Sequence, residues 1–139
     1  MNVEKLLILH EGEKLFPYKC SAGKLTIGVG RNIEDNGITK EESRYLLKND
    51  IARIEKELEK FSFAKNIDPV RKAVVIDMLF NLGLSRFRTF KKMIAALDRQ
   101  RWDDAAAEMV SSAWFNQVGA RAIRLVKMMR SGKWPDNIE

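Results

Sequence analysis

Three side chains with complementary acid–base chemistry lie close together near the start of the chain. Eight residues separate Glu11 from Cys20, and five separate Cys20 from Thr26. A carboxylic acid can donate a proton, a thiolate can act as a base or a nucleophile, and a hydroxyl can position a water molecule. Together these groups would suffice for acid–base hydrolysis if the fold brought them to one cleft.

The segment before Glu11 predicts a helix that ends close to this glutamate. Apolar or half-apolar side chains repeat at the spacing of one helix face, at Val3, Leu6, Leu7 and His10. Gly12 supplies a natural terminus, so Glu11 falls in the last turn. A carboxylate is disfavoured there by the partial negative charge of the helix C-terminus. We therefore interpret Glu11 as a functional residue.

After residue 12 the hydrophobic period changes from that of a helix to that of strands. Apolar side chains alternate on both sides of a turn at residues 21–23, with Leu15, Phe16 and Tyr18 before it and Leu25, Ile27 and Val29 after it. This pattern predicts a hairpin of two short strands, followed by a polar turn region at residues 31–37. Gly28 and Gly30 indicate a bend or a close approach of backbone or ligand. The hairpin should carry Cys20 and Thr26 back toward Glu11.

At these residues the chain resembles the phage endolysins of the T-even lysozyme type, glycoside hydrolase family 24. The matching segments are Glu11-Gly12, Cys20, residues 26–30, residues 99–106 and residues 114–117. The resemblance implies hydrolysis of the β-1,4 bond between N-acetylmuramic acid and N-acetylglucosamine in peptidoglycan. Glu11 would be the general acid. Cys20, where family members carry aspartate or cysteine, would act with Thr26 by activating water or by attacking the sugar.

Cys20 can take either role only if its surroundings favour the thiolate. An ordinary thiol, with a pKa of about 8.5, is mostly neutral at pH 7. Lys19, Lys24 and Arg121 are the cations that the sequence offers for lowering that pKa.

The resemblance also implies a set of substrate-binding residues later in the chain. These are Phe80, Asn81, Gln117 and Arg121. Arg121 aligns with an arginine that pairs with the catalytic acid in this family. Trp102 and Trp114 are interpreted as packing residues, because aromatic side chains at helical spacing usually belong to a core.

Beyond residue 38 the sequence predicts helices. A capping box at Thr39–Glu42 starts a long helix with one apolar stripe. Asp68-Pro69 starts a second helix that is apolar nearly all round and therefore central. Thr89 is expected to cap a short helix through Leu97, Trp102 opens another, and a basic helix follows Gly119.

We therefore predict a mainly helical α+β, lysozyme-like fold that forms a single domain over residues 1–139. A small antiparallel hairpin lobe would span about residues 13–38, and a connecting helix about residues 39–60. An all-helical lobe would follow over about residues 61–139, with the N-terminal helix packed on it. The cleft would lie between the lobes.

Composition limits the classes of function. The chain has 139 residues, of which 45% are hydrophobic and 32% charged, as in a folded globular domain. The net charge of +6 favours an anionic partner. A single cysteine excludes an intrachain disulfide, and a single histidine argues against a zinc site. We expect no cofactor and no metal.

The same sequence sets expectations for location and partners. It shows neither a secretory signal nor a run of roughly 20 apolar residues that could span a membrane. We expect a monomer made in the host cytoplasm that reaches the wall in the periplasm after the membrane is permeabilised. By resemblance, a separate holin would release it. The expected partner is the peptidoglycan glycan strand.

Two alternatives from other classes remain open at this point. A cysteine hydrolase could use Cys20 with His10, although the histidine would have to lie against the thiol. A basic helical module could instead bind nucleic acid, with its cations facing phosphates: Arg121, Arg124, Lys127 and Arg130. We expect no nucleic-acid partner, because the same cations suit a solvated helix face near an acidic wall.

Overall fold

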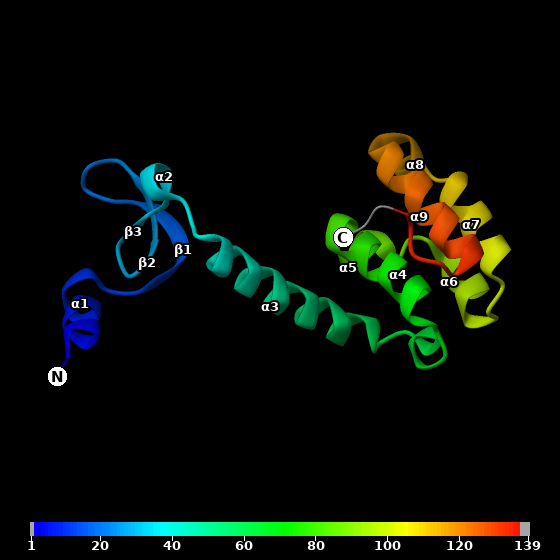
Figure 1. Ribbon diagram of the computed structural model, residues 1–139, viewed down its shortest axis with the longest axis horizontal. Helices are drawn as coiled ribbons and strands as arrows, with labels where there is room; N and C mark the ends of the chain where they lie inside the picture. The colour runs from blue at the N-terminus through cyan, green and yellow to red at the C-terminus, as the bar shows by residue number, and fades with distance from the viewer. Residues whose placement is uncertain (1, 137–139) are drawn as a thin grey trace. The chain divides into compact units, whose positions relative to one another are not determined.

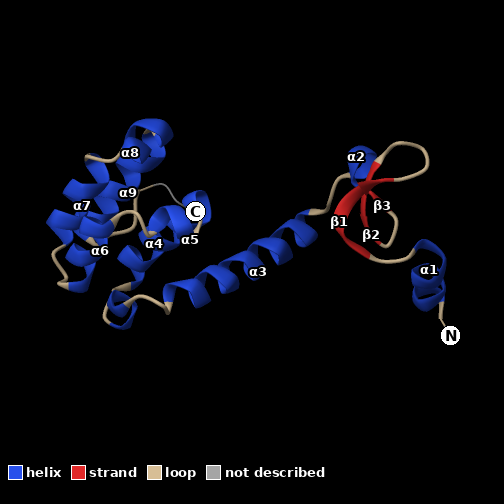
Figure 2. Cartoon of the chain, turned by 180° about the vertical axis from the view of Figure 1, so that it is seen from behind, coloured by secondary structure: helices blue, strands red, loops and turns tan. Residues whose placement is uncertain are grey.

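Helices and one small sheet make up a computed structural model of the chain, which describes residues 2–136 (Figure 1). The chain divides into two compact units, residues 1–47 and residues 48–139. A three-stranded antiparallel sheet lies in the first unit, and helices form the second (Figure 2). The predicted fold class, mainly helical α+β of the lysozyme type, is therefore confirmed.

The first unit opens with helix α1, Val3–Glu11. The side chain of Asn2 caps it by accepting a hydrogen bond from the Lys5 N–H at 2.8 Å. Gly12 ends the helix at φ 74°, and its N–H donates to the Ile8 carbonyl. The predicted helix and its terminus are confirmed, and Glu11 is its last residue.

The sheet has the strand order β1-β2-β3. Its strands are β1 (Lys14–Lys19), β2 (Leu25–Gly28) and β3 (Arg31–Asn32), and the short helix α2 (Ile33–Asn36) follows. In the central strand β2, Thr26 pairs with Tyr18 on one side and with Asn32 on the other. The sequence predicted β1 and β2 but assigned β3 and α2 to a polar turn region, because two polar residues show no alternation.

Helix α3, Lys40–Leu58, starts in the first unit and continues into the second. Its capping box forms as predicted. The Glu42 N–H donates to Thr39 Oγ1 at 3.1 Å, and the Thr39 N–H donates to Glu42 Oε1 at 2.8 Å. Ile54 and Leu58, near the end of the helix, are its buried residues.

The second unit contains the 3₁₀ helix η1 (Ser62–Lys65) and the helices α4 (Pro69–Leu82), α5 (Leu84–Phe87), α6 (Lys91–Asp98), α7 (Trp102–Val110), α8 (Ala113–Val118) and α9 (Ala120–Ser131). Helix α4 begins at the predicted Asp68 cap, and five of its residues are buried, so it is central as predicted: Val70, Val74, Val75, Met78 and Leu79. Phe87, Met93, Met109 and Met129 join them in one core. Trp114 is also buried there.

One helix boundary in this unit differs from the prediction. Thr89 does not cap α6, because its hydroxyl donates to the Arg86 carbonyl at 2.6 Å and α6 begins after Phe90. The predicted lobe boundaries, the packing of the N-terminal helix on the helical lobe and the cleft between lobes stay predictions. Among residues 2–136, no helix is both long enough and apolar enough to cross a bilayer.

Candidate active site

Thr26 is the best buried polar residue of the candidate site. Only 2% of its surface is exposed, because it occupies the central strand of the sheet. Its hydroxyl donates to the Lys24 carbonyl at 2.8 Å. The same carbonyl accepts the Cys20 N–H at 2.9 Å. Since the only hydroxyl proton is engaged with this carbonyl, the Thr26 oxygen presents lone pairs to any water beside it.

Cys20 follows β1 in a tight turn closed by a hydrogen bond from the Gly23 N–H to the Cys20 carbonyl at 2.8 Å. Its thiol is partly exposed. The backbone N–H of Lys24 and then that of Ala22 lower the pKa of this thiol below its ordinary value. A lowered pKa in an accessible thiol marks a reactive cysteine.

The source of this shift differs from the one predicted. The Lys24 ammonium is engaged elsewhere, 3.3 Å from Asp35 Oδ1 and 3.6 Å from Glu34 Oε2. Backbone donors in the turn, rather than lysine or arginine side chains, favour the thiolate of Cys20.

Glu11 lies in the last turn of α1 with its side chain exposed. Its carboxylate lies against Gly30, in the turn between β2 and β3. A methyl group added to Gly30 would fall 3.0 Å from Glu11 Oε2. Among residues 2–136, no side-chain hydrogen bond or ion pair holds Glu11. The contact with Gly30 is therefore what restrains the Glu11 carboxylate.

The first unit therefore brings all three predicted catalytic residues to one small sheet. Cys20 and Thr26 lie together at the start of β2, and Glu11 lies at the turn that follows its end.

The predicted substrate-binding residues all belong to the second unit. The Trp114 indole N–H donates to Asn81 Oδ1 at 2.9 Å, joining α8 to α4. Phe80 precedes Asn81 and is 49% exposed, which is unusual for a phenylalanine beside a core. Trp114, by contrast, is 3% exposed, and Trp102 packs under the Arg71 guanidinium. Both tryptophans are packing residues, as predicted.

Arg121 pairs with an acidic residue that the sequence analysis missed. Its Nε donates to Asp77 Oδ1 at 2.8 Å, and both side chains are about two-fifths exposed. Asp77 precedes Phe80 by three positions and Asn81 by four, a spacing that places the three on one face of α4. That spacing was the available signal. Pairing of Arg121 with the catalytic acid stays a prediction.

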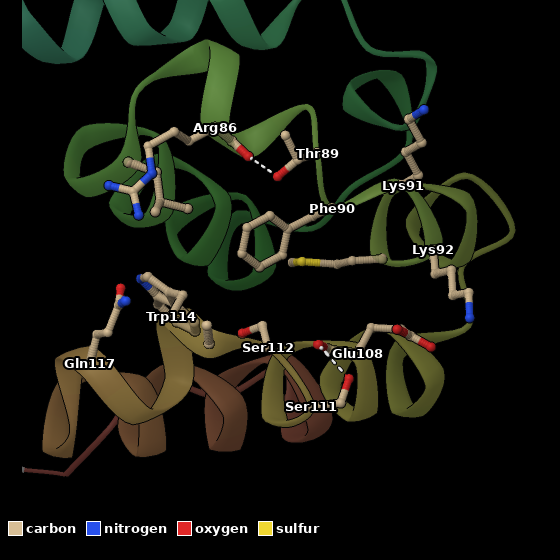
Figure 3. A pocket seen from close by; sticks show the side chains of 13 residues that line it. Arg86, Thr89, Phe90, Lys91, Lys92, Glu108, Ser111, Ser112, Trp114 and Gln117 are labelled. Atoms are coloured by element: carbon tan, nitrogen blue, oxygen red, sulfur yellow. Dashed lines mark hydrogen bonds between the residues drawn. The ribbon is translucent and has the colours of Figure 1, made fainter.

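A hollow of about 620 Å³ lies beside these residues, between α5 and α6 on one side and α7 and α8 on the other. Figure 3 shows Arg86 and Gln117 toward one end of it, with Lys92 and Glu108 toward the other. Phe90 and the buried Trp114 supply its apolar wall. The lining combines aromatic carbon with amide, hydroxyl and cationic groups.

Comparison with known proteins places this arrangement in a family. The sequence profile of the phage lysozyme family matches residues 9–131, which include every candidate site residue named above. The chain belongs to the phage lysozyme family. It is accordingly a hydrolase of the lysozyme type, acting on peptidoglycan as a muramidase.

The chain is also similar to individual proteins from an amoeba and from a phage. Two proteins of Dictyostelium discoideum, named probable T4-type lysozyme 1 and probable T4-type lysozyme 2, are 29% and 27% identical to it. Each match covers 94% of this chain and 95% of the relative. The pre-baseplate central spike protein Gp5 of Enterobacteria phage T4 is 28% identical over 95% of this chain, which spans 28% of that protein.

The two alternatives gain no support from these findings. The side-chain hydrogen bonds of residues 2–136 include none between His10 and Cys20. In α9, Arg121 is paired with Asp77, whereas Arg124, Lys127 and Arg130 are exposed at intervals of three residues, on the face opposite the buried residues of the helix. Such a basic face suits an acidic wall as well as nucleic acid, so it does not favour the nucleic-acid module over the lysozyme.

Proposed function

We propose that this lysozyme hydrolyses the β-1,4 bond between N-acetylmuramic acid and N-acetylglucosamine, with Glu11 as general acid and Cys20 and Thr26 activating water. The observation that carries the proposal is the turn at Cys20. There, backbone N–H groups lower the pKa of a partly exposed thiol beside the buried Thr26 hydroxyl. A structural cysteine would need neither feature.

In the proposed reaction, the Thr26 oxygen accepts a hydrogen bond from one O–H of the attacking water, since its own proton is donated to the Lys24 carbonyl. The Cys20 thiolate takes the proton of the other O–H as the water oxygen bonds to C1 of N-acetylmuramic acid, which keeps the first hydrogen as its new hydroxyl group. Glu11 gives its proton to the departing O4 of N-acetylglucosamine. The thiol and the Glu11 carboxylate then exchange their protons with solvent, which restores the starting state.

Water activation is proposed over direct attack by the thiolate because the Thr26 oxygen, beside the thiol, can accept a hydrogen bond from a water molecule. A base that activates water leads to inversion, whereas a nucleophile that bonds to C1 leads to retention. Inversion at C1 is the expected outcome, and direct attack by Cys20 would give retention.

We further propose that the second unit binds the glycan strand through Phe80, Asn81, Gln117 and Arg121. An exposed aromatic ring suits a sugar face, and amide and guanidinium groups suit hydroxyl and N-acetyl oxygens. The proposed setting is the cell wall of the host, reached from the cytoplasm after the membrane is permeabilised by a separate holin. The proposed active form is a monomer without cofactor.

Product analysis on purified peptidoglycan tests the reaction. We expect new reducing ends on N-acetylmuramic acid, first formed as the α anomer, with incorporation of solvent oxygen at C1. An anhydro end would indicate a transglycosylase, and a reducing N-acetylglucosamine end would indicate cleavage of the other bond. Either result would overturn the proposed reaction, while a β anomer would replace water activation by direct attack.

A further inference from the structure

Gly30 stands apart from the other glycines of the first unit in what surrounds it. Methyl groups added to Gly12, Gly23, Gly28 or Gly37 would meet no atom within 4 Å. A methyl group added to Gly30 would meet three atoms of one side chain: Glu11 Oε2 at 3.0 Å, Cδ at 3.2 Å and Cγ at 3.3 Å. The carboxylate therefore occupies the space that any other residue at position 30 would need.

The backbone does not explain this difference. Gly28 and Gly30 have nearly the same left-handed backbone, with φ 70° and φ 65°. Gly28 is the last residue of β2, and Gly30 lies in the turn that follows it. Both would be strained by an L side chain. What distinguishes them is the Glu11 carboxylate against Gly30.

We propose that Gly30 is a positioning residue for Glu11: its missing side chain provides the seat in which the acid lies. The inference rests on the proposed function of Glu11. In the part of the chain that the structure describes, no hydrogen bond or ion pair fixes this carboxylate. Steric contact with the Gly30 backbone is therefore the restraint on its direction.

The energetics of proton transfer make such a seat important. The acid must lie within about 2.6 to 3.2 Å of the oxygen that it protonates. A glutamate carboxyl that is displaced can turn into solvent at little cost, because the side chain is exposed. Displacing the carboxyl would therefore change the stability of the protein very little. It would slow catalysis, because a misplacement of about 1 Å can cost 100-fold in rate.

Matched substitutions separate this effect from backbone strain. Gly28→Ala and Gly30→Ala should lower the melting temperature by similar amounts, because both put alanine at a positive φ. Only Gly30→Ala should also lower kcat on peptidoglycan, by about 100-fold, with KM nearly unchanged. Gly30→Asn serves as a second variant, because asparagine tolerates a positive φ better and still adds the Cβ.

A measurement without turnover tests the contact itself. In wild-type protein, NMR should show a nuclear Overhauser effect between the Gly30 Hα protons and the Glu11 Hγ protons. The effect should weaken in Gly30→Ala and persist in Gly28→Ala. Its absence in the wild type would overturn the proposal whatever the activity.

The kinetic outcomes separate the two proposals. Full kcat in folded Gly30→Ala or Gly30→Asn would overturn the positioning role and leave the function of Glu11 standing. An equal loss of kcat in Gly28→Ala would also overturn it, because strain in the hairpin would then suffice. A wild-type protein that showed the contact but cleaved no peptidoglycan would overturn the proposed function. It would also overturn the proposal that Gly30 positions Glu11 for catalysis.

Discussion

At the scale of single residues, the candidate site depends on main-chain groups as much as on side chains. The Lys24 carbonyl orients the Thr26 hydroxyl, and the Lys24 and Ala22 N–H groups face the Cys20 sulfur. Residue types and spacing predicted Glu11, Cys20 and Thr26. The same pattern could not predict these donors and acceptors, because every residue of a turn carries a carbonyl and nearly every residue an N–H.

The first prediction concerns Glu11. Glu11→Gln keeps the shape of the side chain but removes its ionisable proton, so the sugar oxygen would leave without protonation. We expect a loss of 10²- to 10⁴-fold in hydrolysis of purified peptidoglycan. Melting temperature and circular dichroism should remain those of the wild type. A folded Glu11→Gln protein with substantial activity would remove Glu11 from the role of acid.

The second prediction concerns Cys20. Cys20→Asp keeps a group that can be negatively charged and should retain much of the activity. Cys20→Ser has nearly the same size but does not ionise in the useful range, so it should lose most activity. Alkylation by iodoacetamide should inactivate the wild type, with a pH midpoint below that of an ordinary thiol because turn N–H groups lower the pKa of Cys20.

The Cys20→Asp protein supplies the control for this experiment. It lacks the thiol and should resist iodoacetamide. If Cys20→Ser were as active as the wild type, the thiol would be a bystander and the base would have to be sought elsewhere.

At the scale of elements, two arginines join different elements of the structure. Arg31 in β3 forms a two-pronged pair with Glu42 in α3, at 2.9 and 2.7 Å. Arg71 in α4 closes the C-terminal end of α9 by donating to the Met129 and Arg130 carbonyls at 2.7 and 3.0 Å. Each contact supports a prediction about stability.

The third prediction is a pH dependence from Glu42. The Arg31 side chain, followed by the Thr39 N–H, lowers the pKa of Glu42 from 4.5 to about 2. Because the folded-state pKa is the lower one, the pair stabilises the protein fully above pH 4.5, and this contribution is lost as the pH falls toward 2. Glu42→Gln should therefore be less stable than wild type at pH 7, and the difference should shrink below pH 4.5 and disappear as the pH falls through 2.

Thermal unfolding at several pH values measures this difference. Glu41→Gln is the matched control, since it removes the same charge one position away. Glu41 makes no ion pair or side-chain hydrogen bond within residues 2–136. A Glu42→Gln deficit that did not shrink on acidification would contradict the prediction.

The fourth prediction concerns Arg71, whose side chain is 13% exposed. Its guanidinium also lies 4.6 Å from the centre of the Trp102 ring and 3.2 Å from Asp68 Oδ1. Arg71→Met keeps the aliphatic stem but leaves two carbonyls without donors and removes the cation–π contact. We expect a loss of about 2 to 4 kcal/mol in the free energy of unfolding.

Arg53→Met controls for loss of an arginine. The Arg53 side chain is 62% exposed, and its pairs with Asp50 and Glu57 are loose, at 3.6 and 3.5 Å. Exposed pairs of this kind are worth less than about 1 kcal/mol. Denaturant unfolding of both variants gives the comparison, and equal losses would show that Arg71 does not hold the end of α9.

These elements also show how far sequence patterns reach. The Thr39–Glu42 and Asp68-Pro69 caps predicted the starts of α3 and α4, because both motifs act within one turn. The strand β3 escaped prediction because its pairing with β2 depends on a neighbour rather than on its own two residues. Thr89 was misassigned as a cap because its hydroxyl bonds backward, to Arg86. Sequence motifs therefore predicted the helix starts, which depend on neighbouring residues. They did not predict pairing that depends on a different element of the structure.

At the scale of the whole molecule, the relevant property is the net charge of +6, to which all charged residues contribute. Several of the cations are neutralised by near neighbours, including Arg31, Arg71 and Arg121. Others lie in no ion pair among the described residues, and Lys91 and Lys92 line the hollow of the second unit. An anionic wall would attract such a surface over roughly 10 Å at 0.1 M salt.

The fifth prediction is that lysis depends on this charge. Rates on purified cell walls should fall as salt rises, because screening weakens the attraction that concentrates the enzyme on its substrate. Replacing Lys91 and Lys92 by glutamine would lower the net charge of +6 by two, to +4. Replacing Lys56 and Lys60 by glutamine would do the same from exposed positions on and just after α3.

If the charge of the whole molecule governs association, both double variants should lose activity equally at low salt and match the wild type at high salt. The measurement is the initial rate of turbidity loss across ionic strengths, with melting temperatures as the control for folding. A larger loss for Lys91 and Lys92 that persisted at high salt would indicate direct contact with the substrate at the hollow. Rates that did not respond to salt in any of the three proteins would show that attraction to the wall does not limit lysis.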